Sequence, residues 1–201
     1  MKSHLRLFAV SSAVLGLGLW FLAAAGNAAD DKDDLRGPVS KVADALRDKK
    51  ADAAKMQAEA IAGKLEGVEE LMHLMSLRRP NGKGGIGIGG KPGIISPDGI
   101  EAKIMALAKK PLSKTQLDKE AEALEGMAYT AAAIGLVAHG KPPDKDDGKK
   151  KKKDWLTWSQ EMHEAALELA EAAKKKDAAG IKTAAGKVDN KCNSCHEVFK
   201  D

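Results

Sequence analysis

Cysteine and aromatic residues are both scarce in this 201-residue chain, and each scarcity narrows the possible folds. With two cysteines, at most one disulfide bond can form within the chain. Beyond the first 29 residues the only aromatic side chains are Tyr129, Trp155, Trp158 and Phe199. A core of alanine, leucine and methionine with so few rings is thin, and a large flat apolar group would supply what it lacks. Because alanine is abundant and runs of β-branched residues are few, the composition favours an all-α fold.

Charge of one sign is not in strong excess either. The formal net charge is +4 at pH 7, and it falls to +2 without residues 1–29, which contain Lys2 and Arg6 but no acidic residue. Proteins that bind nucleic acids or strongly anionic membranes usually show a marked basic excess. We therefore expect no nucleic-acid partner.

Residues 1–29 have the pattern of a secretory signal, with a positively charged start, an uncharged apolar run to Ala25 and small residues that offer a cleavage site. We therefore expect residues 30–201 to form one exported domain in the periplasm. The apolar run is long enough that an uncleaved membrane anchor is the alternative. No cysteine lies near the cleavage site, so a lipoprotein anchor is excluded.

The two cysteines lie close to the C-terminus, in the run Cys192-Asn193-Ser194-Cys195-His196. Residues i, i+3 and i+4 of a helix share one face, so both thiols and the imidazole would point the same way. Two thiols at this spacing can each form a thioether with one haem vinyl group, while the histidine binds the iron as proximal ligand. The motif predicts a covalently bound haem c held by Cys192, Cys195 and His196.

Three other uses of paired cysteines are the alternatives. A thioredoxin-like redox pair needs a βαβ context, which this sequence does not show. Structural zinc needs further ligands at short spacing, but the nearest other histidine is His163 and there is no third cysteine. A disulfide bond between Cys192 and Cys195, in a scaffold without redox function, stays open.

Apolar residues recur at helical spacing over most of the chain beyond Gly37. Ser113 and Gln116 predict a capping box, and we expect Asp154 and Asp177 to begin the last two helices. The expected helices are 38–79, 98–109, 114–139, 155–175 and 177 to the C-terminal residues.

Two segments between these helices have an unusual composition. Residues 80–97 are rich in glycine and match two phosphate-binding patterns, but a helix precedes them, and Pro92 stands where a hydroxyl should bind magnesium. We expect a mobile or partner-facing loop there. Lys149–Lys153 is a run of five lysines in a polar linker. Such runs are usually solvated, and the more specific interpretation is a docking patch for an acidic redox partner.

The ending, with the CxxCH motif in the last helix and then Phe199 and Lys200, resembles the class II c-type cytochromes, cytochrome c-prime and its cytochrome c-556 relatives. The resemblance implies an up-down-up-down four-helix bundle around the haem. This chain would add an extra short helix and a Gly-rich insertion between the first and second main helices. It also implies one-electron transfer with no substrate turned over, so not an enzyme, and by analogy a possible homodimer.

The opposite ligand of the iron decides between two functions. A methionine there would give a six-coordinate electron carrier, whereas an apolar residue would leave an open site that binds NO or CO. His196 lies nineteen residues into the last helix. If the first helix is continuous and antiparallel to the last, this level corresponds to Met56, and Met72 lies too near the helix end. The other candidates are Met162, His163 and His139.

Overall fold

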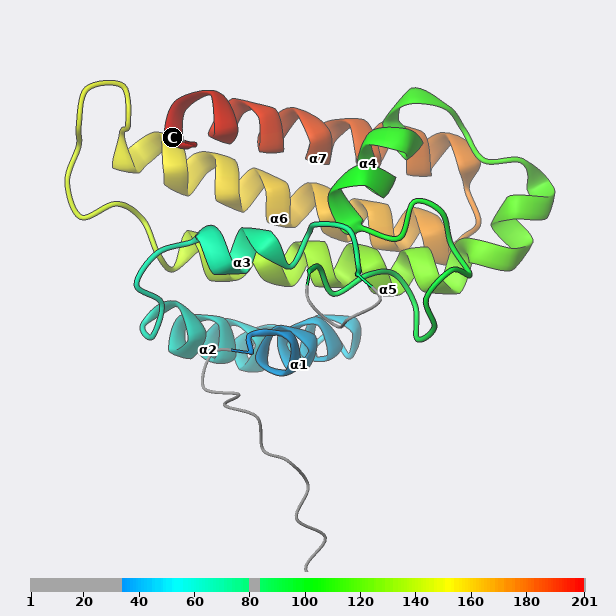
Figure 1. Cartoon of the computed structure of the whole chain (residues 1–201), viewed down its shortest axis with the longest axis horizontal. Helices are drawn as coiled ribbons and strands as arrows, with labels where there is room; N and C mark the ends of the chain where they lie inside the picture. Colours follow the sequence, from blue (N-terminus) through cyan, green and yellow to red (C-terminus); the bar gives the residue numbers. More distant parts are fainter. Residues whose placement is uncertain (1–33, 80–83, 201) are drawn as a thin grey trace, which may run out of the picture. The chain divides into compact units, whose positions relative to one another are not determined.

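The computed structural model describes residues 34–79 and 84–200, and the predicted signal sequence in residues 1–29 lies outside them. In the described ranges the chain forms seven helices and no strand, which confirms the all-α class (Figure 1). The helices are α1 (Arg36–Arg47), α2 (Ala51–Ala62), α3 (Glu69–His73), α4 (Ile100–Lys109), α5 (Lys114–His139), α6 (Lys152–Lys174) and α7 (Ala178–Phe199). Among these helices, none combines the length and apolarity that crossing a membrane requires.

Helix α5 is the element on which most of the others pack. It lies against α6, and α1, α2 and α3 also contact it. Half of its 26 residues are buried, and many of them are alanine or glycine. These small residues let neighbouring backbones come close, since a side-chain carbon added at Gly135 would lie 3.0 Å from the backbone nitrogen of His163 on α6. The helix packing is consistent with a bundle.

Helix α7 lies on the other side of α6, and α4 also packs against it (Figure 1). Contacts between α5 and α6 pair the end of one helix with the start of the other, as the indole Nε1 of Trp155 donates to the carbonyl of Ala138 at 2.7 Å. These two helices are therefore antiparallel. The expected neighbour of the last helix was the first helix of the chain, and the structure instead places α4 there.

The local signals for helix starts are confirmed at two of three positions. The backbone nitrogen of Ser113 donates to Gln116 at 3.0 Å, and the backbone nitrogen of Gln116 donates back to the serine hydroxyl at 3.3 Å. The Asp177 carboxylate accepts from the backbone nitrogens of Ala179 and Gly180. Asp154 was expected to begin its helix, and this is wrong, because α6 begins at Lys152 with no side-chain cap from Lys151.

The expected continuous helix 38–79 is wrong, because the chain reverses after α1. Lys49 has a φ of 59°, in the left-handed region, and the backbone nitrogen of Lys50 then donates to the carbonyl of Ala45 at 2.9 Å. These features end α1 and let α2 pack against it. Each helix has its own apolar face. The two apolar stripes follow one another at the same helical spacing, so in the sequence they resemble the single stripe of one long helix.

The glycine-rich segment was expected to be mobile or partner-facing, and its described part divides in two: residues 84–88 are mostly buried against the helices, whereas residues 89–94 are exposed, so the expectation is wrong only for the first part. Ile88 and Ile95 are almost fully buried. Nη2 of Arg78 donates to the carbonyl of Gly89 at 2.8 Å, and its Nε lies 3.2 Å from Asp98 in an ion pair without a hydrogen bond at that nitrogen. Asp98 also accepts from the backbone nitrogen of Ile88 at 2.7 Å. The glycines leave room for the arginine, because a side chain at Gly87 would overlap its guanidinium group.

This anchoring can be tested by changing Asp98→Ala. The substitution removes the partner of a largely buried arginine and of a backbone donor, and we expect a loss of about 1–3 kcal/mol in the free energy of unfolding, measured by urea denaturation. The control is Asp44→Ala, which breaks an ion pair between half-exposed side chains with Arg47. That loss should stay within about 1 kcal/mol. Equal losses in both variants would contradict the anchoring role of Asp98.

Candidate functional site

The apolar stripe of α7 is well covered along its first half and only partly covered along its second. Ile181, Ala184 and Val188 are almost fully buried in the first half. Cys192, Cys195 and Phe199 continue the stripe, but each keeps part of its surface exposed while it packs against the core. The two cysteines therefore lie at the border between protein interior and open space.

Helix α6 covers one side of α7 along its whole length and runs antiparallel to it. The rings of Trp155 and Phe199 meet edge to face with their centres 5.0 Å apart. Further along, Lys191 pairs with Glu161 at 2.8 Å. Numbers rise along α6 as they fall along α7, so the level of His196 corresponds to about Trp158 on α6.

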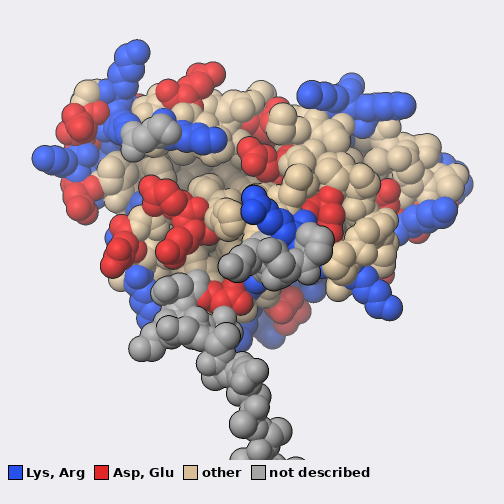
Figure 2. Space-filling model, in the orientation of Figure 1, with Lys and Arg blue, Asp and Glu red and all other residues tan. Residues whose placement is uncertain are grey.

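Helix α4 covers a different side of α7, and its cover ends level with the first cysteine. Pro111, just beyond α4, lines a groove together with Ala178 at the start of α7. Glu101, in the first turn of α4, lies close enough to Cys192 for its charge to act on the thiol. The C-terminal part of α7 therefore extends past the N-terminal end of α4. Figure 2 shows the surface hollowed in the region between the end of α7 and α3.

Both thiols lie in surroundings that favour their neutral form. Burial raises the pKa of the Cys192 thiol to about 12, and the negative charges of Glu101 and Asp189 act in the same direction. Burial also raises the pKa of the Cys195 thiol to about 11. Zinc ligation and thioredoxin-like exchange both require a thiolate, which these surroundings disfavour. A thioether to an apolar group carries no charge and suits the same surroundings.

A metal site built from protein ligands alone finds no support in the described part of the chain. No group of three or more histidine, cysteine or acidic side chains there could hold a metal ion. The two cysteines are free thiols in this structure. The donor set near them is two sulfurs and the imidazole of His196 on the same helix, which fits a haem c better than a zinc ion.

The other histidines that were considered as iron ligands serve the contact between α5 and α6. His163 is buried, and its Nδ1 lies 2.8 Å from the carbonyl oxygen of Ala132. Nδ1 of His139 lies 3.1 Å from the carbonyl oxygen of Leu156. Both rings thus hold two helices together. Met162 is buried on α6 next to Glu161, which pairs with α7.

The structure does not bring Met56 to the motif. Its side chain is 66% exposed, and it lies on α2, which packs against α1 and α5. The reasoning that selected Met56 required one continuous first helix, and that helix is interrupted at Lys49. Met56 as the opposite ligand stays a prediction, without support from these contacts.

Two further residues bear on the site and were not selected from the sequence. Glu101 adds a negative charge beside Cys192, although it is distant in sequence. Met72 on α3 is partly buried against the core, and its exclusion used the same helix arithmetic that placed Met56. Recognising Glu101 required knowing that α4 packs against α7, and the arithmetic that excluded Met72 fails because the chain turns back after α1.

The comparisons with known proteins bear on the C-terminal half of the chain. The family described as Cytochrome C' matches residues 100–200, which is half of the chain. The matched part contains α4 to α7 and the complete CxxCH motif, whereas α1, α2 and α3 lie outside it. No curated protein and no solved structure gives a match.

Proposed function

Because this chain belongs to the Cytochrome C' family, we propose that it holds one covalent haem c and transfers single electrons. The family typically comprises haem proteins that are not enzymes. When bound, the haem supplies the chemistry, since its iron can exist as ferric or ferrous and so accept or release one electron. The observation that carries the proposal is the partly covered stripe of α7, which leaves apolar surface open at the two cysteines.

In this proposal Cys192 and Cys195 fix the ring to α7 by thioethers, and His196 is the proximal ligand. Their spacing places all three on one helical face, so the thioethers also orient the imidazole. The rings of Trp155 and Phe199 pack edge to face at the end of the α6–α7 interface, just beyond the motif.

A second candidate function is a five-coordinate site that binds NO or CO. The exposure of Met56 favours it, because the methionine selected from the sequence does not lie at the motif. Met72 is the partly buried methionine on the helix that borders the hollow in Figure 2. The proposal therefore has two forms. In the first, Met72 would lie opposite the iron and the protein would transfer electrons. In the second, no such ligand would be present and the site would bind NO or CO.

We also propose that the protein is exported and works in the periplasm. The support is the charge and apolar pattern of residues 1–29, which lie outside the described residues, together with the family, whose members are usually periplasmic. Export fits covalent haem attachment. An uncleaved anchor would be seen as full-length protein in the membrane fraction, whereas mature protein beginning near Asp30 supports the proposal.

The attachment is tested by the double change Cys192→Ala and Cys195→Ala. Without both thioethers the haem should be fully extracted by acidified acetone, whereas the wild type should retain it. Ser194→Ala is the matched control, because this residue lies between the cysteines and its hydroxyl only donates to the carbonyl of Asn190. Haem that resists extraction from the double variant would contradict the assignment.

The opposite ligand is tested by comparing Met56→Leu with Met72→Leu. We expect Met56→Leu to leave the ferric absorption and EPR spectra unchanged, because an exposed side chain on α2 does not reach the motif. Met72→Leu should convert a low-spin ferric spectrum to high-spin if the protein is six-coordinate. A spin-state change in the Met56 variant would restore Met56 as the ligand, and a high-spin wild type that binds CO would support the gas-binding form.

The charge of Glu101 should influence the reduction potential of the haem. A carboxylate beside Cys192 stabilises the more positive ferric iron, so Glu101→Gln should raise the potential in a spectroelectrochemical titration. The control is Glu59→Gln, which makes the same charge change at an exposed site on α2. A shift of the same size in both variants would show that Glu101 has no special position.

A further inference from the structure

We propose that the end of the protein where α6 begins and α7 ends is a docking surface for an acidic redox protein. The proposal rests on the proposed haem site, since it concerns how electrons reach that site. The surface consists of the lysine run Lys149–Lys153 and the aromatic pair Trp158 and Phe199, which lie near the start of α6 and the end of α7. Four observations support it: the position of the lysines near the motif, their unfavourable place at the start of α6, the excess of positive charge, and the partly exposed aromatic residues.

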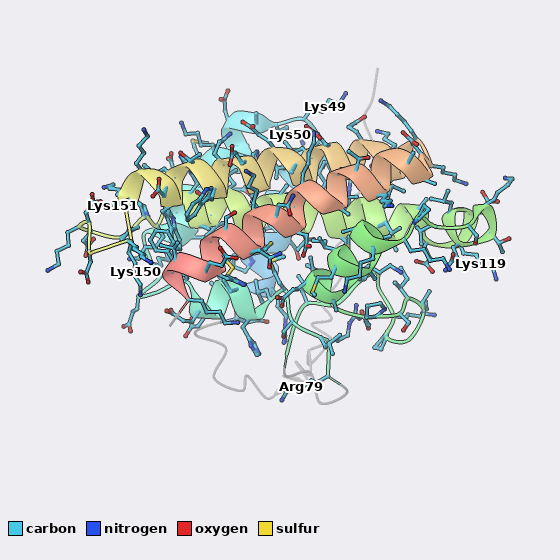
Figure 3. The ribbon with its side chains drawn as sticks, turned by 90° about the horizontal axis from the view of Figure 1, so that it is seen from above. Lys49, Lys50, Arg79, Lys119, Lys150 and Lys151 are labelled. Atoms are coloured by element: carbon cyan, nitrogen blue, oxygen red, sulfur yellow. The ribbon has the colours of Figure 1, made fainter. Side chains whose placement is uncertain are left out.

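The lysine run lies close to the haem motif along the bundle. The antiparallel register of α6 and α7 places His196 level with about Trp158. Lys152 precedes Trp158 by six residues, which is about 9 Å along the helix axis at about 1.5 Å per residue. Figure 3 shows Lys150 and Lys151 at the same end as the last turns of α7, and Lys119 at the opposite end.

The positive charges of the lysines oppose the dipole of α6, the helix that they begin. Lys152 and Lys153 occupy the first turn of α6, and Lys151 stands at the N-cap position without a side-chain cap. The N-terminal end of a helix carries partial positive charge, so cations there are unfavourable. Asp154 is the acidic residue in that turn. A local arrangement that works against the fold is characteristic of a functional surface.

The run keeps a basic excess after its internal contacts are counted. Residues 141–154 contain seven lysines and four aspartates. Asp146 accepts from the backbone nitrogen of Lys152 at 2.9 Å and pairs with Lys151 at 3.5 Å. In the described part of the chain no ion pair forms for Lys149, Lys152 or Lys153, and all three are exposed. Their charges therefore face solvent and can attract an acidic partner.

The aromatic part of the surface has a residue type that is enriched in interfaces. The rings of Trp158 and Phe199 lie 6.1 Å apart, and both residues keep part of their surface exposed. Aromatic side chains at the centre with charged residues around them are the typical arrangement of protein–protein interfaces. The lysines would steer the encounter, and the aromatic pair would let the partner approach the haem-bearing end of α7.

The test compares two electron donors of opposite charge that each give one electron to the ferric haem. One is a reduced acidic [2Fe–2S] ferredoxin, whose cluster is oxidised as the iron is reduced. The other is the hexaammineruthenium(II) cation, which is oxidised to the trivalent complex. Reduction is followed by stopped-flow absorption at low and at high ionic strength. An absorption spectrum of the wild type is recorded first, because absence of haem would refute the proposed function and not this inference.

The test variant carries Lys149→Gln, Lys152→Gln and Lys153→Gln. Reduction by the ferredoxin should slow roughly tenfold at low ionic strength and lose most of its salt dependence. Reduction by the ruthenium complex should not slow. The melting temperature should stay equal or rise, because two cations leave the start of α6.

The matched control carries Lys119→Gln, Lys174→Gln and Lys175→Gln. These changes remove the same charge near the start of α5 and at the end of α6, far from the lysines of the test variant. It should react with the ferredoxin like the wild type. Equal slowing in both variants would show a general charge effect and overturn the proposal, as would unchanged ferredoxin kinetics in the test variant. If the three lysines instead proved necessary only for sedimentation with phosphatidylglycerol vesicles, the surface would be a membrane contact and the proposal wrong.

Discussion

The structure depends on an apolar stripe of α7 that the protein itself covers only in part. Packing against α4 and α6 buries the stripe as far as Val188. From Cys192, which lies level with the start of α4, the stripe keeps part of its surface exposed. Leaving apolar surface uncovered opposes folding, since its burial is worth roughly 25 cal/mol per Å². A covalent haem at the cysteines would bury that surface. The scarcity of aromatic residues fits the same account, because the prosthetic group would supply the large ring of the core.

The parts of the fold that depend on neighbouring residues could be predicted from the sequence. The capping box at Ser113 and the cap at Asp177 each need only a side chain and backbone donors two or three residues away. The reversal at Lys49 could not be predicted in this way. A lysine in the left-handed conformation has no turn signal of its own, and the apolar faces of α1 and α2 follow one another without a change of period. Residues 84–88 of the glycine-rich segment are mostly buried, and Arg78 reaches into the segment, which is a contact between distant residues.

The residues of the candidate site also divide into those that could be predicted from the sequence and those that could not. Cys192, Cys195 and His196 are neighbours on one helix, so their common face follows from helix geometry alone. The residue opposite them depends on which helix lies across the gap. That could not be inferred while α1, α2 and α3 were taken as one helix, and the error led to Met56. Glu101 was missed for a different reason, because α4 was expected to belong to an insertion and not to be a neighbour of α7.

The two halves of the chain have separable roles in this arrangement. Helices α4 to α7 match the Cytochrome C' family and contain the CxxCH motif. Helices α1 and α2 instead pack on α5, whereas the helices that pack against α7 are α4 and α6. Changes in α1 and α2 should therefore alter stability more than the surroundings of the iron. The start of α6 differs from both, since its lysines oppose the helix dipole and add nothing to the core. This locally unfavourable helix start lies near the motif, where the proposed redox partner would bind.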